Sequence, residues 1–570
     1  MRKSKAGRLQ ESHGEAYLPT SSQRNFESVR QPAFSCKREQ LKLSPVPYES
    51  RVRILRTLPV TQLYQPSLLQ RQSGLHIWVR YALAVCGSVI LVPLVLAQYG
   101  YSPLKVFLAT ILLGVCLYPT ARNFANREVD LPAIPVLCLA YAFLFAIPVF
   151  TREPAVRLAF GQTAYLDDEN IVAALLLSIL GVGALLIGFY GFRATTLAKN
   201  LPIVGLHLDE KKAVVYCVAI GLLAPLLARA EDVLPEPLFL QLSALIRVLQ
   251  NQALVAIAIL GSLIYSGRGL VWYRALLYYI IGLTVLQGLA NAFIEQAIAP
   301  IATLLIIRWQ LTKRLPLMGI IAAIVIILFL SPVKQEYRRA VWFEKIPVDA
   351  SSVDKAWFWA RQASRYWMDT FSGQRSLVES TEQAASRTDL IHQFALVYSL
   401  TPSEIPYQYG ATYSYFLITL IPRAIWPEKP EAGGANKFFA VNYGLTTEEG
   451  ARRSTFGVSL LAESYINFGW VGVIFIMAFQ GALLNLLQRI FGDGKPGSGG
   501  QAVYVAFFVF FLNGIGTSAD ILFGNVIQSL LLGCALLWWI RAKPSTMRPL
   551  ETRLALPAEQ LRNCSSSAGR

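Results

Sequence analysis

The chain contains a series of long apolar segments, and these constrain its fold more strongly than any other feature of the sequence. A helix needs about 20 predominantly apolar residues to cross the hydrocarbon core of a bilayer. Because a spanning segment must satisfy its own backbone hydrogen bonds, the pattern favours helices. It predicts an all-α, polytopic membrane protein with twelve transmembrane helices. The twelve segments are 78–98, 103–120, 131–150, 171–192, 213–228, 242–265, 275–292, 296–311, 315–331, 470–487, 502–519 and 521–540.

The composition agrees with this fold class. Only 15% of the 570 residues are charged, whereas soluble globular chains carry about 25%. So few charges cannot cover several soluble domains, and the 54% of hydrophobic residues exclude a disordered chain. The seven cysteines are scattered without a CxxC pair, a pattern that indicates neither a disulfide framework nor a zinc site.

Most of the net charge of +17 lies in two polar tails at the ends of the chain. Residues 1–76 carry 13 basic and five acidic residues, and residues 541–570 carry six basic and two acidic residues. Basic tails beside a membrane are explained by the positive-inside rule and by contact with anionic lipid head groups. No nucleic-acid-binding motif accompanies them, so nucleic acid is not an expected partner.

The short loops set the predicted orientation. If the N-terminal tail is cytoplasmic, the short loops on its side carry Lys and Arg, whereas those on the other side are acidic or neutral. We therefore predict that both termini are cytoplasmic. The predicted regions are a disordered basic tail (1–76), nine transmembrane helices (77–331), a large outer loop (332–469), three transmembrane helices (470–540) and a cytoplasmic basic tail (541–570).

The outer loop is too long for a structureless connection in a compact protein, so we expect it to contain helices. Its part 354–371 places Trp and Tyr among charges, which is typical of an interfacial amphipathic helix. We find no internal repeat, whereas transporters usually consist of two related halves with a site at the midplane. The division into nine helices, a loop and three helices favours a site on the outer face. A flippase or transporter remains the non-enzymatic alternative.

Two groups in the first half of this loop are candidate site residues. Lys334, Arg338 and Arg339 follow the ninth helix. Arginine binds phosphate oxygens bidentately, so they are candidates for a diphosphate clamp, with a basic collar on lipid head groups as the alternative. The segment SRTDLIHQF adds Arg387, Asp389 and His392. Arg387 and Asp389 are either a solvated ion pair or part of a site. His392 is a candidate general base, although a lone histidine is more often structural.

A Pro-rich turn in the second half of the loop holds Arg423, Trp426 and Lys429 within PRAIWPEKP. Proline fixes φ, so the turn is expected to be rigid. Trp426 suits either stacking on a sugar or the interfacial aromatic belt. Two further basic residues, Arg452 and Arg453, follow along the chain.

An acidic residue then occurs in apolar sequence. Glu463 and Asn467 are four residues apart on a helix that leads into the tenth predicted span. An ionisable residue at membrane depth is a functional hypothesis by default. The alternative is a structural carboxylate that has a hydrogen-bonding or ionic partner.

These segments resemble a known family. PRAIWPEKP, preceded by TPSEIPYQYGATY and followed by LLAESYINFGWVG, is similar to the Wzy-type O-antigen and oligosaccharide repeat-unit polymerases of bacterial envelopes. That family has a P-R-x-x-x-P-x-K-P turn and a G/A-E-x-Y-x-N-F-G helix, and VKQEYRR and SRTDL also fit its pattern. The resemblance covers about residues 330–475, while the preceding helices match only in hydropathy. Ala462 stands where the family's pattern favours glycine.

The resemblance implies a GT-C-like fold and a reaction at the periplasmic face of the bacterial inner membrane. A glycan chain on undecaprenyl diphosphate is transferred to the terminal sugar hydroxyl of a lipid-linked repeat unit, without a nucleotide sugar. No cofactor or metal is expected, because no His, Cys and Asp spacing matches a zinc site and the arginines can supply the positive charge. An O-antigen ligase or another lipid-linked glycosyltransferase is the enzymatic alternative. The expected partners are the undecaprenyl-diphosphate-linked oligosaccharide, membrane lipids, and the flippase and chain-length regulator of the same pathway.

The resemblance also implies roles for the candidate residues. The expected catalytic residues are Arg423, Glu463, Arg387 and Asp389. The expected substrate-binding residues are Lys334, Arg338, Arg339, His392, Trp426, Lys429, Arg452, Arg453, Tyr465 and Asn467.

Overall fold

Helices account for nearly all of the regular structure in the computed structural model of the chain. The described residues from Leu68 onward belong to one compact unit. The structure describes residues 68–126, 131–151, 155–201, 208–342, 350–376, 389–421, 426, 428, 433–453, 456–492 and 498–541.

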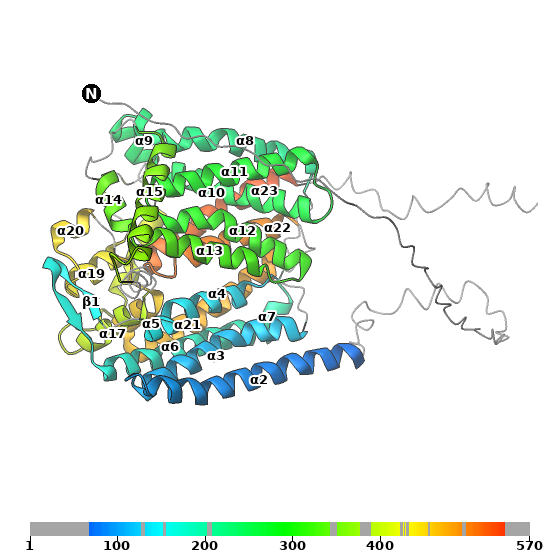
Figure 1. Cartoon of the computed structure of the whole chain (residues 1–570). Helices are drawn as coiled ribbons and strands as arrows, with labels where there is room; N and C mark the ends of the chain where they lie inside the picture. Colours follow the sequence, from blue (N-terminus) through cyan, green and yellow to red (C-terminus); the bar gives the residue numbers. More distant parts are fainter. Residues whose placement is uncertain are drawn as a thin grey trace, which may run out of the picture. The chain divides into compact units, whose positions relative to one another are not determined.

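Each of the twelve predicted segments coincides with a helix or a run of consecutive helices. Figure 1 shows these helices side by side along a common direction. They are α2 (Leu68–Ala97), α3 (Pro103–Asn126), α4 (Ala133–Tyr141) with η2 (Ala142–Ala146) and α5 (Pro148–Thr151), α6 (Asp168–Ala194), α8 (Glu210–Ala228), α10 (Glu236–Tyr265), α11 (Val271–Ala290), α12 (Ile294–Thr312), α13 (Leu317–Leu330), α21 (Leu460–Leu487) with η6 (Gln488–Gly492), α22 (Gly499–Asn513) and α23 (Ala519–Ile540).

Short elements connect these helices or form the predicted outer loop. The loop elements gather at one end of the long helices, and the start of α2 and the end of α23 lie at the other end (Figure 1). The connecting elements are β1 (Ala155–Arg157), η3 (Ala159–Gly161), β2 (Thr163–Tyr165), α7 (Thr196–Lys199) and α9 (Ala230–Val233). The loop elements are α14 (Lys334–Trp342), α15 (Ser352–Phe371), α17 (Ile391–Leu400), η5 (Ala411–Tyr413), α18 (Ser414–Leu420), α19 (Gly434–Asn442) and α20 (Glu448–Arg453).

The described helices form an all-α fold that is compatible with a polytopic membrane protein. Eight helices in the described part are long and apolar enough to cross a membrane. Large apolar side chains also point outward, such as Leu83, Leu91 and Leu94 of α2, which are 62–69% exposed. Soluble monomers rarely expose apolar patches of this kind, whereas lipid covers them without cost. The number of twelve spans and the orientation of the tails stay predictions.

Two helix boundaries and one additional element differ from the sequence-based prediction. Helix α2 begins at Leu68, inside the range assigned to the N-terminal tail. Helix α21 begins at Leu460, inside the range assigned to the outer loop, and its helical geometry is interrupted at Phe468 and Gly469. The predicted start of the tenth span at 470 therefore marks this break. The antiparallel hairpin of β1 and β2 adds a small sheet to the otherwise helical chain.

Glycines bring α6 and α21 into close contact. A Cβ at Gly188 would lie 2.0 Å from the carbonyl oxygen of Ala478, and a Cβ at Gly481 would lie 2.0 Å from that of Leu185. Small residues at helix interfaces in membranes allow backbones to approach this closely. Because α21 carries Glu463 near its start, this packing fixes the position of the candidate site.

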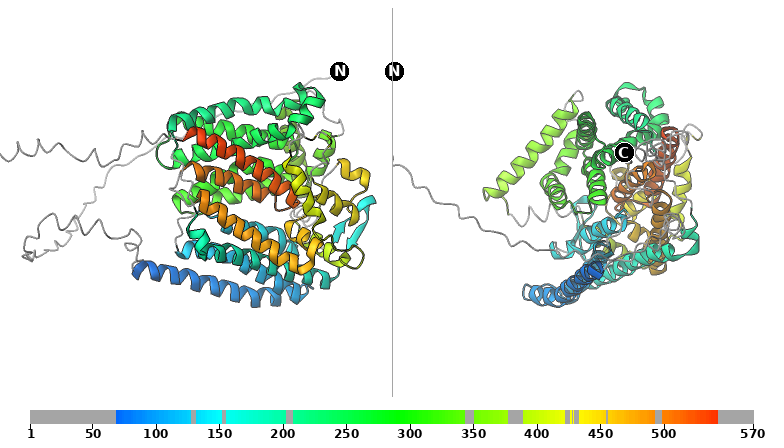
Figure 2. Two further views of the ribbon diagram at one scale, coloured as in Figure 1. Left: turned by 180° about the vertical axis from the view of Figure 1, so that it is seen from behind. Right: turned by 90° about the vertical axis from the view of Figure 1, so that its right-hand side faces the viewer.

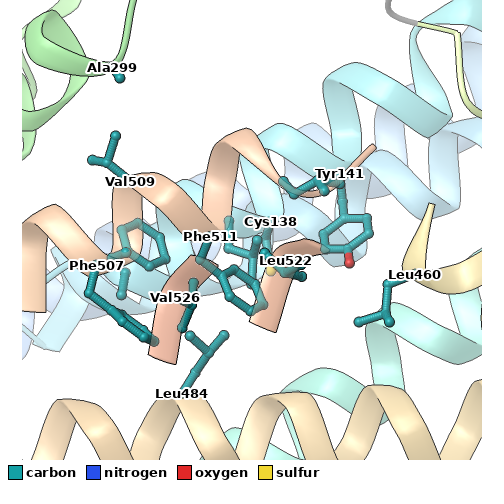
Figure 3. Packing of buried hydrophobic residues seen from close by; sticks show 14 of the residues in the cluster. Cys138, Tyr141, Ala299, Leu460, Leu484, Phe507, Val509, Phe511, Leu522 and Val526 are labelled. Carbon is teal, nitrogen blue, oxygen red and sulfur yellow. The ribbon is translucent and has the colours of Figure 1, made fainter. Parts of the chain in front are cut away.

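The apolar core lies among α4, α6, α10, α21, α22 and α23. Figure 3 shows Cys138 of α4, Phe511 of α22, and Leu522 and Val526 of α23 within it. This core holds the start of α23 next to α21, which matters for the polar groups described below.

Candidate functional site

Glu463 lies in the first turn of α21 and is completely buried. The Thr412 hydroxyl donates a hydrogen bond of 2.8 Å to Oε1, and the Ala519 backbone N–H donates one of 2.7 Å to Oε2. No lysine or arginine of the described chain forms an ion pair with it. Neutral donors from η5 and from the start of α23 therefore satisfy this carboxylate.

Asn467 extends the network by one helical turn. Its Nδ2 donates to the Thr412 hydroxyl at 2.7 Å and to the carbonyl oxygen of Glu463 at 2.8 Å. Its Oδ1 accepts the backbone N–H of Gly410 at 2.9 Å. Asn467, Thr412 and Glu463 thus form a continuous hydrogen-bonded chain, and the two motif residues are brought together as their four-residue spacing predicts.

The break in α21 supplies further attachment points. Since the helix is interrupted after Asn467, the carbonyl oxygens of Ile466 and Asn467 accept the backbone N–H groups of Gln408 and Tyr409, at 3.0 and 3.1 Å. Gly469 has a φ of +62°, which glycine adopts without steric cost. A helix terminus must satisfy its free carbonyl groups, and here the segment before η5 does so.

Asp520 lies in the first turn of α23 and is also completely buried. Its Oδ2 accepts the backbone N–H of Gly433 at 2.7 Å, while its Oδ1 has no hydrogen-bond partner among the described residues. Ala519, which donates to Glu463, is the residue before it. Two buried carboxylates therefore meet at the N-terminus of α23, where the helix dipole stabilises negative charge.

The residues that flank the Pro-rich turn are attached to the same place. Gly433 follows the turn and binds Asp520, as described above. Thr419 precedes it: the Thr419 hydroxyl donates to the carbonyl oxygen of Asp520 at 3.5 Å, and Gln528 Nε2 of α23 donates to the Thr419 carbonyl oxygen at 3.1 Å. We call Thr412, Gly433, Glu463, Asn467, Ala519 and Asp520 the α21–α23 junction.

Asn436 of α19 holds the segments before α21 and α23 together. Its Oδ1 accepts the backbone N–H groups of Val458 and Ser518, at 2.9 and 3.0 Å, and its Nδ2 donates to the Thr517 hydroxyl at 2.9 Å. One buried amide thereby links two helix starts that are far apart in the sequence.

Tyr413 lies beside the junction. Its hydroxyl donates to Ser464 Oγ at 3.5 Å. Burial, and then the negative charge of Glu463, raises the pKa of Tyr413 above the usual range of a tyrosine. The phenol therefore stays protonated and serves as a hydrogen-bond donor.

Tyr465, a predicted substrate-binding residue, is buried on the same helical segment. Its hydroxyl donates to the Thr401 carbonyl oxygen at 3.4 Å, and its ring contacts Phe394, Tyr398 and Tyr407 at centroid distances of 5.7–6.1 Å. These contacts hold the N-terminal piece of α21 against α17 and the segment before η5.

The predicted basic clamp lies in a separate cluster. Lys334 is buried and forms an ion pair of 3.0 Å with Glu295. Arg338 Nε donates to the Ala292 carbonyl oxygen at 3.4 Å, and the guanidinium lies 5.3 Å from the Phe293 ring centroid. Burial lowers the pKa of Arg338, although the charge of Glu295 opposes this shift. Arg339 is exposed.

Asp389 and His392 are paired with each other. Asp389 Oδ2 lies 2.6 Å from His392 Nδ1, Asp389 Oδ1 accepts the backbone N–H of His392 at 3.1 Å, and both side chains are buried. Asp389, two residues before the start of α17, therefore accepts a backbone N–H of the first turn of this helix. This geometry favours a structural pair, while the predicted roles in catalysis and substrate binding remain predictions.

The remaining candidates lie at the edge of the described chain. Trp426 is 40% exposed. Arg423, Lys429 and Arg387 lie outside the described residues, as do the side chains of Arg452 and Arg453 at the end of α20. Among the residues that the structure describes, no group of three or more His, Cys, Asp or Glu is placed to hold a metal ion.

Comparison with known proteins places the chain in a family. A family model described as a domain of unknown function, DUF8712, matches residues 169–546, more than half of the chain. The chain belongs to the DUF8712 family. No curated protein and no solved structure matches the chain. The DUF8712 region runs from α6 to α23 and so contains the whole α21–α23 junction.

Within the DUF8712 region, the sequence analysis missed Asp520. The sequence did contain a signal for Asp520. This acidic residue follows one predicted span directly and precedes the next, so it lies in apolar sequence, as Glu463 does before the tenth predicted span. The rule that an acidic residue in apolar sequence indicates function applies equally to both. Thr412 and Asn436 carry no comparable signal, because hydroxyl and amide side chains are frequent in loops.

Proposed function

We propose that this protein is a membrane-embedded glycosyltransferase that polymerises lipid-linked oligosaccharide repeat units at the periplasmic face of the bacterial inner membrane. In this proposal the chain crosses the membrane twelve times, in a GT-C-like arrangement, with 332–469 outside and both tails in the cytoplasm. One observation carries it. The residues that flank the Pro-rich turn and the helix that carries Glu463 and Asn467 meet at the start of α23. The two segments that resemble the polymerases thus share one junction.

The proposed reaction joins two lipid-linked substrates. An oxygen of the acceptor sugar hydroxyl attacks the anomeric carbon of the donor chain and forms the new glycosidic bond. The bond between that carbon and the diphosphate oxygen breaks, and undecaprenyl diphosphate leaves with the electron pair. The hydroxyl proton passes to a base, for which Glu463 is the first candidate. Because both oxygens of Glu463 accept hydrogen bonds, it must release Thr412 or Ala519 to take that proton.

The cations of the loop are proposed to stabilise the leaving group. Negative charge develops on the diphosphate as the bond breaks, and fixed donors in a water-poor site stabilise it best. Arg423 and Lys429 are carried by the turn whose two flanks bind the start of α23. The rigid junction would therefore keep these cations close to the membrane surface, where the diphosphate of a lipid-linked donor lies.

A deletion strain tests the reaction class. We expect loss of the gene to leave single repeat units on the cell surface, and restoration of long chains by the wild-type gene. Glycan ladders on a gel report the outcome. Loss of all attached glycan would instead assign a ligase, accumulation of unexported lipid-linked units would assign a flippase, and unchanged ladders would exclude the pathway.

Reporter fusions test the topology on which the proposal depends. Fusions after residue 380 and after residue 544 should give opposite signals with reporters that are active on only one side of the membrane. Matching signals at the two positions would contradict the placement of the loop and the C-terminal tail on opposite sides.

A further inference from the structure

Helix α15 differs in direction from its neighbours. It begins with a capping box, in which Ser351 and Asp354 each accept from the other's backbone N–H. Figure 1 and the right panel of Figure 2 show it crossing the direction of the long helices, near the end where the loop elements lie. An amphipathic helix in this orientation is suited to lie along a membrane surface.

Aromatic side chains attach α15 to the end of α13. Trp359 is completely buried, stacks on Tyr337 with 4.6 Å between ring centroids, and donates from Nε1 to the Leu330 carbonyl oxygen at 3.2 Å. Trp367 Nε1 donates to the Phe329 carbonyl oxygen at 3.0 Å. The last carbonyl groups of a helix have no partner within the helix. The two indoles therefore fix α15 at the level where α13 ends.

The outward side of α15 carries an apolar stripe. Val353, Trp357, Met368 and Phe371 are 60%, 68%, 68% and 77% exposed. At about 100° per residue these four positions fall within an arc of about 60°. The buried Trp359 lies on another side of the helix. Exposure of four large apolar side chains to water is unfavourable by about 25 cal/mol per Å² of surface, which indicates that another apolar phase covers the stripe.

A basic side lies next to the stripe. Arg361 and Arg365 are exposed and one turn apart, and Arg375 lies 4.8 Å from the Tyr366 ring centroid. Over 334–342 and 350–376 there are seven basic and three acidic residues. Basic residues beside an inserted apolar face are typical of helices that bind anionic lipid surfaces.

We propose that α15 lies in the interface of the lipid bilayer, with its stripe among the acyl chains and Arg361 and Arg365 on anionic head groups. Helix α13, which packs against α15, also exposes large apolar side chains, with Val325 and Leu328 57% and 36% exposed. These apolar surfaces, together with the positive charge, identify a lipid surface as the occupant. The inference does not depend on the proposed function, because it involves no sugar.

Photocrosslinking tests the insertion of the stripe. The full-length protein is placed in nanodiscs of equal parts phosphatidylcholine and phosphatidylglycerol, with p-benzoylphenylalanine at Trp357 or Phe371, or at exposed Arg157 of β1 as the matched control. We expect lipid adducts from the first two positions to exceed those from the third several-fold, measured by mass spectrometry. Equal adducts at all three positions, or adducts to a second protein molecule, would overturn the proposal.

Lipid enrichment tests the basic side. Protein purified from the same mixed nanodiscs should retain more phosphatidylglycerol than phosphatidylcholine, and Arg361→Gln with Arg365→Gln should reduce this ratio severalfold. The control is Arg157→Gln, which alters an exposed basic residue of the β1 strand. A ratio that the double variant leaves unchanged, or that the control lowers equally, would refute the head-group contact.

Discussion

Two regions of this protein hold charged residues in apolar surroundings, and they stabilise them in different ways. At the α21–α23 junction, Glu463 accepts hydrogen bonds from a hydroxyl and a backbone N–H. At the platform formed by α14 and α15, Lys334 instead forms an ion pair with Glu295, which is 49% exposed. A buried charge without hydrogen bonds or an ion pair is unfavourable by several kcal/mol.

The comparison separates two uses of charge. On the platform, Glu295 neutralises Lys334. We therefore expect the fold to tolerate the replacement of both residues together. The junction keeps two carboxylates without a paired cation among the described residues, at the place where the Pro-rich turn is attached. We therefore expect the junction to matter for activity and the platform for attachment to the membrane.

The largest effect is expected for Arg423. Arg423→Ala should lower polymerisation by about 100-fold or more, the loss typical of removing a donor that stabilises transition-state charge. Arg423→Lys should fail nearly as badly, because lysine keeps the charge but loses the bidentate fork. Glycan ladder length reports the activity. Arg157→Lys, at an exposed position of the β1 strand, is the matched control and should keep long ladders. A fully active Lys variant would reduce Arg423 to an anchor on lipid head groups.

Replacement of Glu463 by alanine should remove the folded junction. The change leaves the Ala519 N–H and the Thr412 hydroxyl without an acceptor, at about 1–3 kcal/mol for each buried group. We expect a marked loss of protein from the membrane fraction, measured by immunoblot. Glu448→Ala is the control, since the Glu448 carboxylate is exposed in its ion pair with Lys437 and should change abundance little. Equal abundance of both variants would contradict the buried network.

Glu463→Gln removes the negative charge of this side chain but keeps its shape and its ability to form hydrogen bonds. Its amide oxygen can still accept from Ala519, and its NH₂ can donate to Thr412, so abundance should remain near that of the wild type. Polymerisation should nevertheless be lost, because the amide cannot accept a proton. Ladders and abundance are measured together. Normal ladders at normal abundance would end the catalytic assignment of Glu463 and leave Asp389 and His392 as the candidate bases.

The smallest effect is expected at the platform ion pair. Lys334→Met should lower stability by about 1 kcal/mol, the upper range for pairs with solvent contact. The double variant with Glu295→Gln should recover part of this loss, because the Glu295 carboxylate is then not left without Lys334. Thermal unfolding of the purified protein gives both values. If the loss of stability in the double variant equalled the sum of the losses in the two single variants, the ion pair would contribute nothing to stability. The contrast between the two regions would then weaken.

The helices could be predicted from the sequence because each depends on a local pattern of apolar residues. Apolar length alone placed a helix at every predicted span, and the amphipathic pattern of 354–371 placed α15. Glu463 and Asn467 were also predictable as a pair, since four residues separate neighbours on a helix face. The break at Phe468 and Gly469 was not predicted, since an isolated glycine in an apolar run does not by itself indicate a helix break.

The partners of the charged residues were decided by the tertiary structure. Thr412 and Ala519 lie 51 and 56 positions from Glu463 in the sequence, and Gly433 lies 87 from Asp520. Lys334 forms an ion pair with Glu295, which is 39 positions away in the sequence, and its predicted role in binding a diphosphate stays a prediction. Hydrophobic length and periodicity are properties of a segment and can be read along the chain. A hydrogen bond or ion pair requires two segments to meet within about 3 Å, and only the packing of the helices determines which segments do so.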